Sequence, residues 1–266
     1  MKTTPVALSI AGSDSSGGAG IQADIRAFSA AGVYGTTALT ALTAQNPGEV
    51  TAVVGCEPSF VRAQIETVFN ALPVGAAKTG MLWSADVIQA VLESFEPHAG
   101  IPLVVDTVMI AASGAKLLND DAIELYRKAL IPKATLITPN IDEANLLLDG
   151  SNINANTQVD SAKLLADKFG CSVLLKGGHL EGDPTDILVH HGEVHRWQHT
   201  RVHHVDTHGS GCTLSASITA HLAKGSSLTS SVDSALKAVN TALQKPAKVT
   251  EDLSLLSIEA TSNRST

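Results

Sequence analysis

A glycine-containing segment directly before an apolar helical run is the part of this sequence best suited to chemistry. The segment reads Asp206-Thr207-His208-Gly209-Ser210-Gly211-Cys212-Thr213 and leads into CTLSASITAHLA. Because glycines leave the backbone uncovered, successive N–H groups can point at one anion, and a helix N-terminus adds partial positive charge. The pattern predicts a site for a transferring phosphoryl group. The alternative is an ordinary N-cap loop in which Ser210 or Thr207 is the cap.

Cys212 is the residue of this segment that could move a proton. A helix N-terminus lowers the pKa of a thiol from about 8.5 toward neutrality, so a fraction of Cys212 is expected to be thiolate. A thiolate could accept the proton of a substrate hydroxyl during phosphoryl transfer. A buried, inert cysteine is the alternative.

Two charged residues stand at the ends of short apolar runs. Asp106 ends LVVD and Lys176 ends VLLK, and ligands of open parallel sheets bind at the carboxyl ends of strands. Asp106 is therefore predicted to bind hydrated Mg²⁺, with capping of the following loop as the alternative. Lys176 is predicted to place a positive charge beside a polyphosphate, with a solvated lysine as the alternative.

Asn140 and Glu143 begin a helical segment that follows Thr138-Pro139. An Asn N-cap with Glu at the third helical position satisfies two backbone donors reciprocally, so the spacing is that of a capping box. A functional role is equally compatible with this spacing. The residues alone leave both possibilities open.

The elements that position these residues alternate along the chain. Short β-type runs are followed by helical periodicity, which predicts parallel strands joined by crossover helices in an α/β fold. Strands are expected at 6–11, 38–44, 52–56, 76–79, 103–106, 135–138 and 173–176. Two alternating runs within 186–199 predict a hairpin at a sheet edge, and two helices from about 211 and 229 close the fold. We take 1–245 as one domain and 246–266 as a polar, loosely held tail.

The bulk composition limits the classes of partner. The chain has 266 residues, 44% of them hydrophobic, and a formal net charge of −8. Scattered Lys and Arg residues argue against a nucleic-acid partner. Cys56, Cys171 and Cys212 lie far apart, which suits reduced thiols in a cytosol. No signal peptide or membrane-spanning stretch is found, so we expect a cytoplasmic protein with no membrane partner.

Three other patterns are discounted. Gly17-Gly18-Ala19-Gly20 lacks the G-x-G-x-x-G order, and no G-x-x-x-x-G-K-[ST] occurs, so a Rossmann dehydrogenase and a P-loop kinase are both disfavoured. A group of histidines lies in and after the expected hairpin, where strand alternation divides them between opposite faces and no Cys or carboxylate grouping completes a metal site. We expect solvated side chains for His190, His191, His195, His199, His203 and His204.

On these residues the chain resembles a known family. The octapeptide 206–213 is similar to the anion-hole segment of hydroxymethylpyrimidine/phosphomethylpyrimidine kinases, which belong to the ribokinase-like superfamily. Further segments resemble that family's motifs in the same chain order, namely AGSDSSGGAGIQAD (11–24), TALTAQN (40–46), KTGM (78–81), VDTVM (105–109), TPNIDEA (138–144) and LKGGH (175–179). The resemblance spans residues 6 to about 245. It implies a three-layer α/β/α sandwich with a mostly parallel central sheet.

The resemblance also implies an activity. It is that of an ATP-dependent kinase which phosphorylates 4-amino-5-hydroxymethyl-2-methylpyrimidine and then its monophosphate to the diphosphate, in thiamin biosynthesis. ATP is implied as co-substrate, Mg²⁺ as cofactor and a homodimer as the assembly. Cys212 takes the place of the general-base aspartate of the wider superfamily. The implied sites are catalytic Gly209, Ser210, Gly211 and Cys212, nucleotide-binding Lys176, Asn140 and Thr207, and metal-binding Asp106 and Glu143.

Gln45 is our first choice for recognising the pyrimidine. Its carboxamide offers a donor and an acceptor side by side, and an aminopyrimidine presents the matching pair, as adenine does to glutamine. A strand-end amide that caps backbone is the alternative. The resemblance adds further pocket residues, Gly12, Ala19, Met81 and Val108, with Asp24 supporting the hydroxyl end. The small-residue loop after Val108 is expected to act as a lid.

Two other functions stay open at this point. A pyridoxal kinase shares the fold, and related chains with this cysteine segment accept both ring types, but Gln45 favours the pyrimidine. A non-catalytic pyrimidine-binding protein is the second alternative, and the intact anion segment argues against it. One departure is the C-terminus, because many members of the family end in a Gly-rich segment near the active site, whereas this chain ends in KPAKVTEDLSLLSIEATSNRST.

Overall fold

The structure is a computed structural model that describes residues 3–109, 120–203, 205–251 and 253–258. A nine-stranded sheet with the order β3-β2-β1-β4-β5-β6-β7-β8-β9 forms its centre. The strands are β1 (Val6–Asp14), β2 (Tyr34–Asn46), β3 (Glu49–Gly55), β4 (Val74–Thr79), β5 (Leu103–Val105), β6 (Leu136–Ile137), β7 (Ser172–Leu175), β8 (Thr185–His190) and β9 (Glu193–Gln198). Neighbours from β2 to β7 are parallel, and the pairs β2–β3, β7–β8 and β8–β9 are antiparallel.

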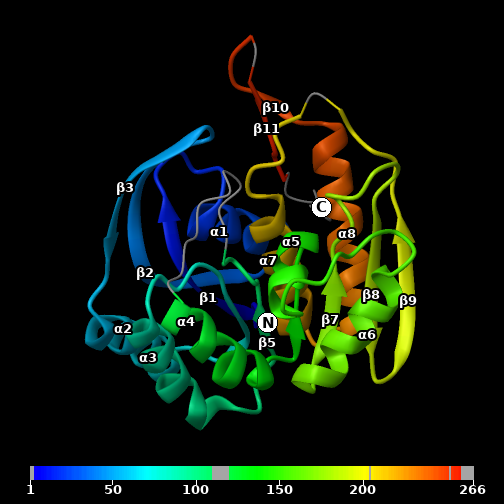
Figure 1. The fold of residues 1–266 in the computed structure, drawn as a ribbon. Coiled ribbons are helices and arrows are strands. Elements are labelled where there is room, and N and C mark those ends of the chain that lie inside the picture. The colour runs from blue at the N-terminus through cyan, green and yellow to red at the C-terminus, as the bar shows by residue number, and fades with distance from the viewer. Residues whose placement is uncertain (1–2, 110–119, 204, 252, 259–266) are drawn as a thin grey trace.

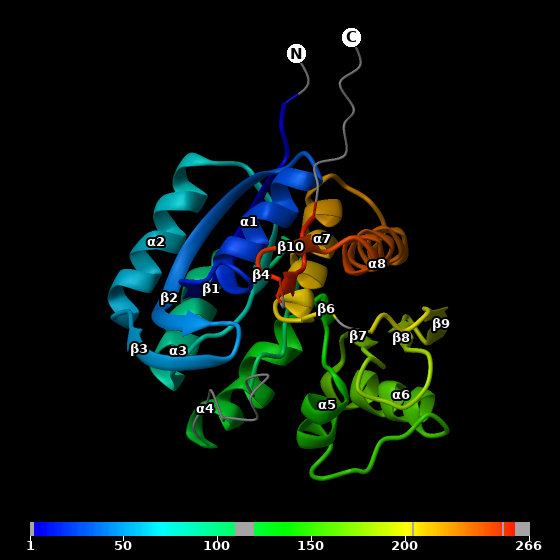
Figure 2. The same ribbon diagram turned by 90° about the horizontal axis from the view of Figure 1, so that it is seen from above.

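Helices cover both faces of this sheet (Figure 1). They are α1 (Gly20–Ala30), α2 (Pro58–Ala71), α3 (Ala85–Phe95), α4 (Asp120–Leu125), α5 (Ile141–Leu147), α6 (Gln158–Phe169), α7 (Ser210–Ala223) and α8 (Leu228–Gln244). A π-helical turn, Tyr126–Leu130, continues α4, and short 3₁₀ turns occupy Glu96–His98 and Ile131–Lys133. Seen from above, α1, α7 and α8 lie on one side of the sheet and α2 to α6 on the other (Figure 2). The predicted three-layer α/β/α sandwich is confirmed.

Strand alternation explains why two separate apolar layers form. Val104 in β5 and Leu136 in β6 pack against α7 and α8, whereas their neighbours Val105 and Ile137 pack into the layer of α2 to α6. Such strands must be apolar on both faces, which is the pattern of a buried parallel sheet. α8 completes its layer with apolar residues at helical spacing.

β1 is longer than predicted. We expected the strand to end at Ala11, but pairing with β2 continues through Ser13 opposite Leu42 and Asp14 opposite Thr43, after an irregularity between Ala11 and Ser13. β2 likewise runs on to Asn46 and turns into β3. The polar residues of both strand ends are thereby held by sheet pairing rather than by a free loop. The predicted edge hairpin is confirmed as β8 and β9.

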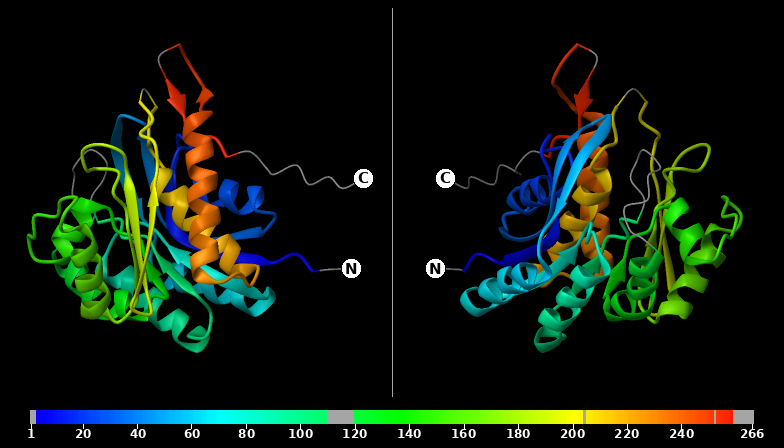
Figure 3. Two further views of the ribbon diagram at one scale, coloured as in Figure 1. Left: turned by 90° about the vertical axis from the view of Figure 1, so that its right-hand side faces the viewer. Right: turned by 60° about the vertical axis from the view of Figure 1, so that its left-hand side comes forward.

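The C-terminal segment departs from the expectation of a loosely held tail. β10 (Ala247–Lys248) pairs antiparallel with β11 (Ser254–Leu255) and forms a ribbon beyond the end of α8 (Figure 3). The Asp206 N–H donates to the Ser254 carbonyl at 3.3 Å, and Ile258 packs against the apolar cluster of α1 and α7. Apolar residues near the end of the chain, which we read as part of a polar run, account for this docking.

The predicted lid is not tested by the described residues. The predicted lid after Val108 falls mainly on 110–119, outside the described residues. Among the helices that are described, none combines the length and apolar character needed to cross a membrane.

Candidate active site

The segment before α7 packs directly on the loop that follows β1. Gly209, the N-cap residue of α7, has a φ of 77°, in the left-handed region that glycine adopts without strain. A Cβ atom at Gly209 would lie 1.9 Å from the Gly18 carbonyl oxygen, and a Cβ at Gly18 would lie 2.5 Å from Cδ2 of His208. Glycine at both positions allows the two backbones to approach this closely.

The first turn of α7 offers backbone donors to a ligand. The Ser210 N–H donates to the Thr207 carbonyl at 3.0 Å, and the Thr213 N–H donates to the Gly209 carbonyl at 2.9 Å. Within the described part of the chain, the N–H groups of Gly211 and Cys212 have no hydrogen-bond acceptor. Unpaired N–H groups at a helix N-terminus form an anion-binding site. Of the predicted anion-hole donors, the Ser210 N–H is therefore engaged internally, and the N–H groups of Gly211 and Cys212 in the helix and of Gly209 at its N-cap are without an acceptor among the described residues.

Lys176, directly after β7, reaches the same helix start. Its Nζ atom lies 3.3 Å from the position that a Cβ of Gly211 would take. Burial by itself lowers the pKa of Lys176, but the charges of Asp106 and Glu143 outweigh burial and raise that pKa. A permanent cation thus lies beside the two available N–H groups, which suits an anionic ligand.

Asp106, directly after β5, is buried between two lysines. Its Oδ1 atom lies 3.7 Å from Nζ of Lys176, and its Oδ2 atom lies 3.9 Å from Nζ of Lys78. The Thr138 hydroxyl donates to Oδ1 at 3.3 Å, and the Ser215 hydroxyl donates to Oδ2 at 3.0 Å. Each carboxylate oxygen accepts one of these hydrogen bonds and keeps a second lone pair, which could accept from a water molecule of a hydrated metal ion.

Asn140 and Glu143 form the capping box of α5. Asn140 Oδ1 accepts from the Glu143 N–H, and Glu143 Oε2 accepts from the Asn140 N–H, both at 2.8 Å. The Thr107 hydroxyl also donates to this Oε2 at 2.8 Å. Burial raises the pKa of Glu143 to about 7, against the lowering influence of Lys176. The structural alternative is therefore realised, and only Oε1 is left for a ligand.

The donor set fits a hydrated Mg²⁺ rather than a directly chelated ion. Among the residues that the structure describes, no three His, Cys, Asp or Glu side chains are grouped to hold a metal. Hard cations such as Mg²⁺ keep several waters and use few carboxylates. A nearby cation would also favour the charged form of the buried Glu143. The hydrated ion would therefore be held at Glu143 Oε1 and, through one of its waters, at Asp106.

The prediction of a lowered thiol pKa at Cys212 is wrong for this structure. Burial raises the pKa of Cys212 to about 12. The charge of Lys78 and a hydrogen bond from the Gly20 N–H both lower this pKa, but they do not offset the loss of water. Cys212 lies in the first turn of α7 as expected, and it is protonated near neutral pH.

Asp24 does not lie where a substrate hydroxyl could reach it, contrary to our expectation. Its side chain is fully buried and accepts from the Ser9 hydroxyl at 2.5 Å and from Nζ of Lys78 at 2.9 Å. Both carboxylate oxygens are engaged by these two donors. Asp24 therefore holds Lys78, a buried cation to which we had assigned no role although it lies in the KTGM segment.

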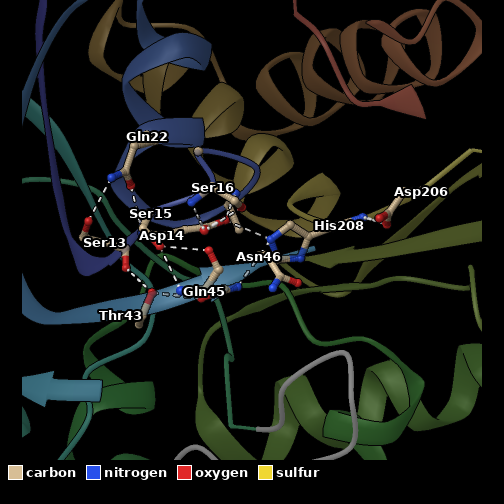
Figure 4. Close-up of polar contacts among 12 residues, drawn as sticks. Ser13, Asp14, Ser15, Ser16, Gln22, Thr43, Gln45, Asn46, Asp206 and His208 are labelled. Atoms are coloured by element: carbon tan, nitrogen blue, oxygen red, sulfur yellow. Dashed lines mark hydrogen bonds and ion pairs between the residues drawn. The ribbon is translucent and has the colours of Figure 1, made fainter. Parts of the chain in front are cut away.

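Gln45 lies where the ends of β1 and β2 meet the segment before α7 (Figure 4). The Ser15 hydroxyl donates to the Gln45 carbonyl and accepts from the Gln45 N–H, both at 2.8 Å. Its carboxamide extends between Thr43 Oγ1, at 3.1 Å, and His208 Nε2, at 3.4 Å. Gln45, which we predicted to recognise the pyrimidine, thus lies beside His208 of the anion-binding segment.

Asp14 and His208 form an ion pair that our sequence analysis missed. His208 Nε2 lies 2.9 Å from Asp14 Oδ2, which also accepts from the Ala19 N–H at 2.8 Å. Burial opposes ionisation, yet hydrogen bonds from His208, Ser16 and Ala19 hold the pKa of Asp14 well below its usual range. Asp14 in turn raises the pKa of His208. Their presence in two Gly-rich segments was the only signal in the sequence.

The remaining predicted pocket residues lie near these strand ends in different states of burial. Gly12 is packed by Met81, since a Cβ at Gly12 would lie 2.7 Å from Cε of that methionine. Val108 is half-buried just after β5, and Thr207 is exposed. Ala19 is the N-cap residue of α1.

The expectation of solvated histidines is wrong for two positions of the hairpin region. His190 Nδ1 lies 2.8 Å from the Ser172 hydroxyl. His199 lies 3.2 Å from Asp186 through Nε2 and 2.6 Å from Asn240 through Nδ1. These histidines join β8 and β9 to the fold. His204 lies outside the described residues.

The chain is similar to known proteins along most of its length. A family model for phosphomethylpyrimidine kinase matches residues 14–255. A hydroxymethylpyrimidine/phosphomethylpyrimidine kinase of Salmonella typhimurium is 45% identical over 217 residues, which cover 80% of this chain and 81% of the relative. A bifunctional thiamine biosynthesis protein of Geobacter sulfurreducens is 41% identical over 89% of this chain. The chain spans only about half of that bifunctional protein, 49% of its length.

Two solved structures are closely similar in fold. The phosphomethylpyrimidine kinase of Clostridium difficile 630 has a TM-score of 0.79 at 39% identity, with 91% of this chain and 99% of that chain covered. An ADP complex of Bacillus subtilis pyridoxal kinase has a TM-score of 0.89 at 31% identity, with 97% and 98% covered. The backbone agrees better with the pyridoxal kinase and the sequence with the pyrimidine kinase. Since side chains decide chemistry, we give the sequence more weight for function.

Proposed function

The chain belongs to the phosphomethylpyrimidine kinase family, and on that premise we propose that it transfers phosphate from ATP to hydroxymethylpyrimidine and then to the resulting monophosphate, in thiamin biosynthesis. The observation that carries the proposal is the start of α7. There two unpaired N–H groups, of Gly211 and Cys212, lie beside the permanent cation of Lys176. Such an arrangement stabilises a phosphoryl group as charge develops on its oxygens.

The residues around this point have complementary tasks in the proposal. Lys176 offsets polyphosphate charge, and the N–H groups of Gly211 and Cys212 bind the migrating phosphoryl oxygens. Gln45 holds the aminopyrimidine edge, which orients the hydroxymethyl group toward the same point. Phosphoryl transfer needs little covalent chemistry from the protein, so positioning of the two substrates accounts for most of the acceleration.

Cys212 is proposed as the proton acceptor of the first transfer. The raised pKa of its thiol means that little thiolate exists near neutral pH. The charge of Lys78 is the largest influence that lowers the pKa of this thiol and so favours the thiolate. In the second transfer the nucleophile is a phosphate oxygen that is already ionised, so that step depends less on a base.

Mg²⁺ is proposed as the cofactor, held through Glu143 Oε1 and through water at Asp106. When bound, the ion would neutralise charge on the phosphate oxygens of ATP. Asn140 caps α5 and so positions Glu143 for this contact. Thr207 and the main chain around it complete the proposed nucleotide side.

The test of this proposal is turnover with defined acceptors. We expect ADP release in the presence of the pyrimidine alcohol and of its monophosphate, with formation of the diphosphate. Pyridoxal is the matched competitor, because the TM-score of 0.89 to a pyridoxal kinase makes it the second candidate substrate. A higher kcat/KM for pyridoxal than for the pyrimidine alcohol would overturn the substrate assignment, and ligand binding without any turnover would overturn the kinase.

Three wider expectations remain part of the proposal. They are a single kinase domain over 1–245, a cytoplasmic location and a homodimer. Light scattering tests the last of these, with an expected mass near twice that of the 27.5 kDa chain. A monomer mass would contradict it.

A further inference from the structure

The carboxamide of Gln45 lies between two groups whose own hydrogen bonds decide what each can offer it. Its Oε1 atom lies 3.1 Å from Thr43 Oγ1, and its Nε2 atom lies 3.4 Å from His208 Nε2. Figure 4 shows both contacts together with the partners of Thr43 and His208. A carboxamide has an acceptor end and a donor end, so the demands of the two neighbours determine which end faces which.

Thr43 offers Gln45 an acceptor. Its hydroxyl carries a single hydrogen, and the Ser13 carbonyl lies 2.8 Å from Oγ1, closer than the carboxamide. A carbonyl oxygen can only accept, so the hydrogen belongs in that shorter contact. Oγ1 can then only accept from Gln45, so the carboxamide must present its N–H group to Thr43.

His208 offers Gln45 a donor. Its Nε2 atom lies 2.9 Å from Asp14 Oδ2, and an ionised carboxylate can only accept. The hydrogen is therefore on Nε2 whether the ring is neutral or charged. The longer contact of 3.4 Å to Gln45 then calls for an acceptor, because the same N–H can be shared by two oxygens.

We propose that Thr43 and His208 are positioning residues which lock the Gln45 carboxamide in one orientation, with Nε2 toward Thr43 and Oε1 toward His208. A half-turn of the carboxamide achieves this arrangement and satisfies both neighbours. Ser15 holds the Gln45 main chain on both its N–H and its carbonyl, so the side chain starts from a fixed point. The inference rests on the proposed function, in which Gln45 reads the pyrimidine.

The lock has a consequence for specificity. Oε1 accepts from the exocyclic amino group on the His208 side, and Nε2 donates to the ring nitrogen on the Thr43 side. The matching 4-oxo analogue, 5-hydroxymethyl-2-methylpyrimidin-4(3H)-one, presents an acceptor and a ring N–H in the opposite order. A locked carboxamide must reject it, whereas a freely rotating one could turn to accept it.

The experiment measures the ratio of kcat/KM for the amino substrate to kcat/KM for the 4-oxo analogue. Thr43→Val removes the hydroxyl at nearly constant volume, and Thr43→Ser keeps it. We expect the ratio to fall about tenfold in Thr43→Val, the effect of one lost hydrogen bond, and to stay near the wild-type value in Thr43→Ser. The KM for ATP is expected to stay within about twofold in both variants.

A second pair of variants covers the case in which Thr43→Val fails to fold. His208→Met removes the donor to Gln45, whereas His208→Gln keeps an N–H at a similar distance from the backbone. We expect the same fall of the ratio in His208→Met and a smaller fall in His208→Gln. A ratio that is unchanged in Thr43→Val and in His208→Met would overturn the lock.

Gln45→Ala separates the failure of the lock from the failure of the proposed function. If Gln45 reads the pyrimidine, the ratio collapses in Gln45→Ala, and adding Thr43→Val to it causes no further fall. If the ratio collapses in Gln45→Ala but is unchanged in Thr43→Val, the lock is wrong and the role of Gln45 in binding the pyrimidine stands. A ratio that survives Gln45→Ala means that Gln45 does not read the pyrimidine, which removes both the lock and this part of the proposed function.

Discussion

Nζ of Lys78 lies 2.9 Å from Oδ1 of Asp24, and both side chains are completely buried. Lys78 is also the main positive influence on Cys212, and it lies 3.9 Å from Asp106. A buried pair of this kind connects α1 and β4 to the point where α7 begins. The pair therefore affects the stability of the fold and the charge around Cys212, since neither buried side chain can touch a substrate.

Asp24→Asn is expected to destabilise the fold rather than weaken substrate binding. Removing the Asp24 charge leaves buried Lys78 with the more distant carboxylate of Asp106, 3.9 Å away, and breaking a buried pair in this way costs about 3–5 kcal/mol of unfolding free energy. Urea titration measures this loss, and the KM for the pyrimidine alcohol is expected to be nearly unchanged in protein that remains folded. Glu124→Gln, which breaks the exposed pair with Lys128, is the control and should change stability little. A rise in KM at full stability would instead restore Asp24 to the substrate pocket.

Gly209→Ala is expected to abolish most activity, because a methyl group cannot fit against the Gly18 carbonyl. A Cβ there would lie 1.9 Å from that oxygen, so the anion-binding turn must move. We expect kcat/KM to fall at least about 10²-fold, comparable to the loss of an oxyanion donor. Gly225→Ala is the matched control, since Gly225 has a φ of 82° but open space around it. If both variants lose equal activity, backbone strain and not the contact with Gly18 is responsible.

The Asp14–His208 pair predicts a pH-dependent stability. The pKa of His208 in the folded protein is raised above its usual 6.5. Its ionisation therefore stabilises the fold fully below about pH 6.5, and this stabilisation is lost as the pH rises through the pKa of the folded state. The pKa of Asp14 in the folded protein is lowered. Its ionisation therefore stabilises the fold above about pH 4, and this stabilisation is lost as the pH falls further. Asp206 is the other charged group that acts on His208.

Thermal or urea unfolding of His208→Gln checks this dependence. Relative to wild type, we expect a loss of about 1 kcal/mol at pH 6, after allowance for solvent screening of the pair, and a smaller loss at pH 9. A loss of equal size at both pH values would show that the charge of His208 plays no part.

The raised pKa of Cys212 predicts an activity that climbs with pH. Below a pKa of about 12, the thiolate fraction grows about tenfold per pH unit, so kcat/KM for the alcohol should rise from pH 7 to pH 9 without a plateau. Cys212→Ala should lose this slope and slow the first transfer by about 10²–10⁴-fold. The second transfer should fall less. A plateau near pH 7 would indicate a lowered pKa, and full turnover in Cys212→Ala would remove the thiol from the mechanism.

The strands that carry Asp106 and Lys176 could be located from sequence because they depend on local apolar runs, whereas β1 and β2 extend beyond their predicted ends. Asp106 and Lys176 were found in this way, and Asn140 with Glu143 through a local capping pattern. The electrostatics of the site could not be predicted, because they arise between segments far apart in the chain. Cys212 is governed by burial and by Lys78, and Asp14 meets His208 across 194 positions. The prediction that Asp24 supports the substrate hydroxyl was wrong for the same reason, because Asp24 is buried against Lys78 of β4.

A crystal structure with a non-hydrolysable ATP analogue and the pyrimidine alcohol tests the central claim most directly. The account predicts the γ-phosphate within hydrogen-bonding distance of the Gly211 and Cys212 N–H groups, with the hydroxymethyl group on its other side. A γ-phosphate bound away from the first turn of α7 would contradict it.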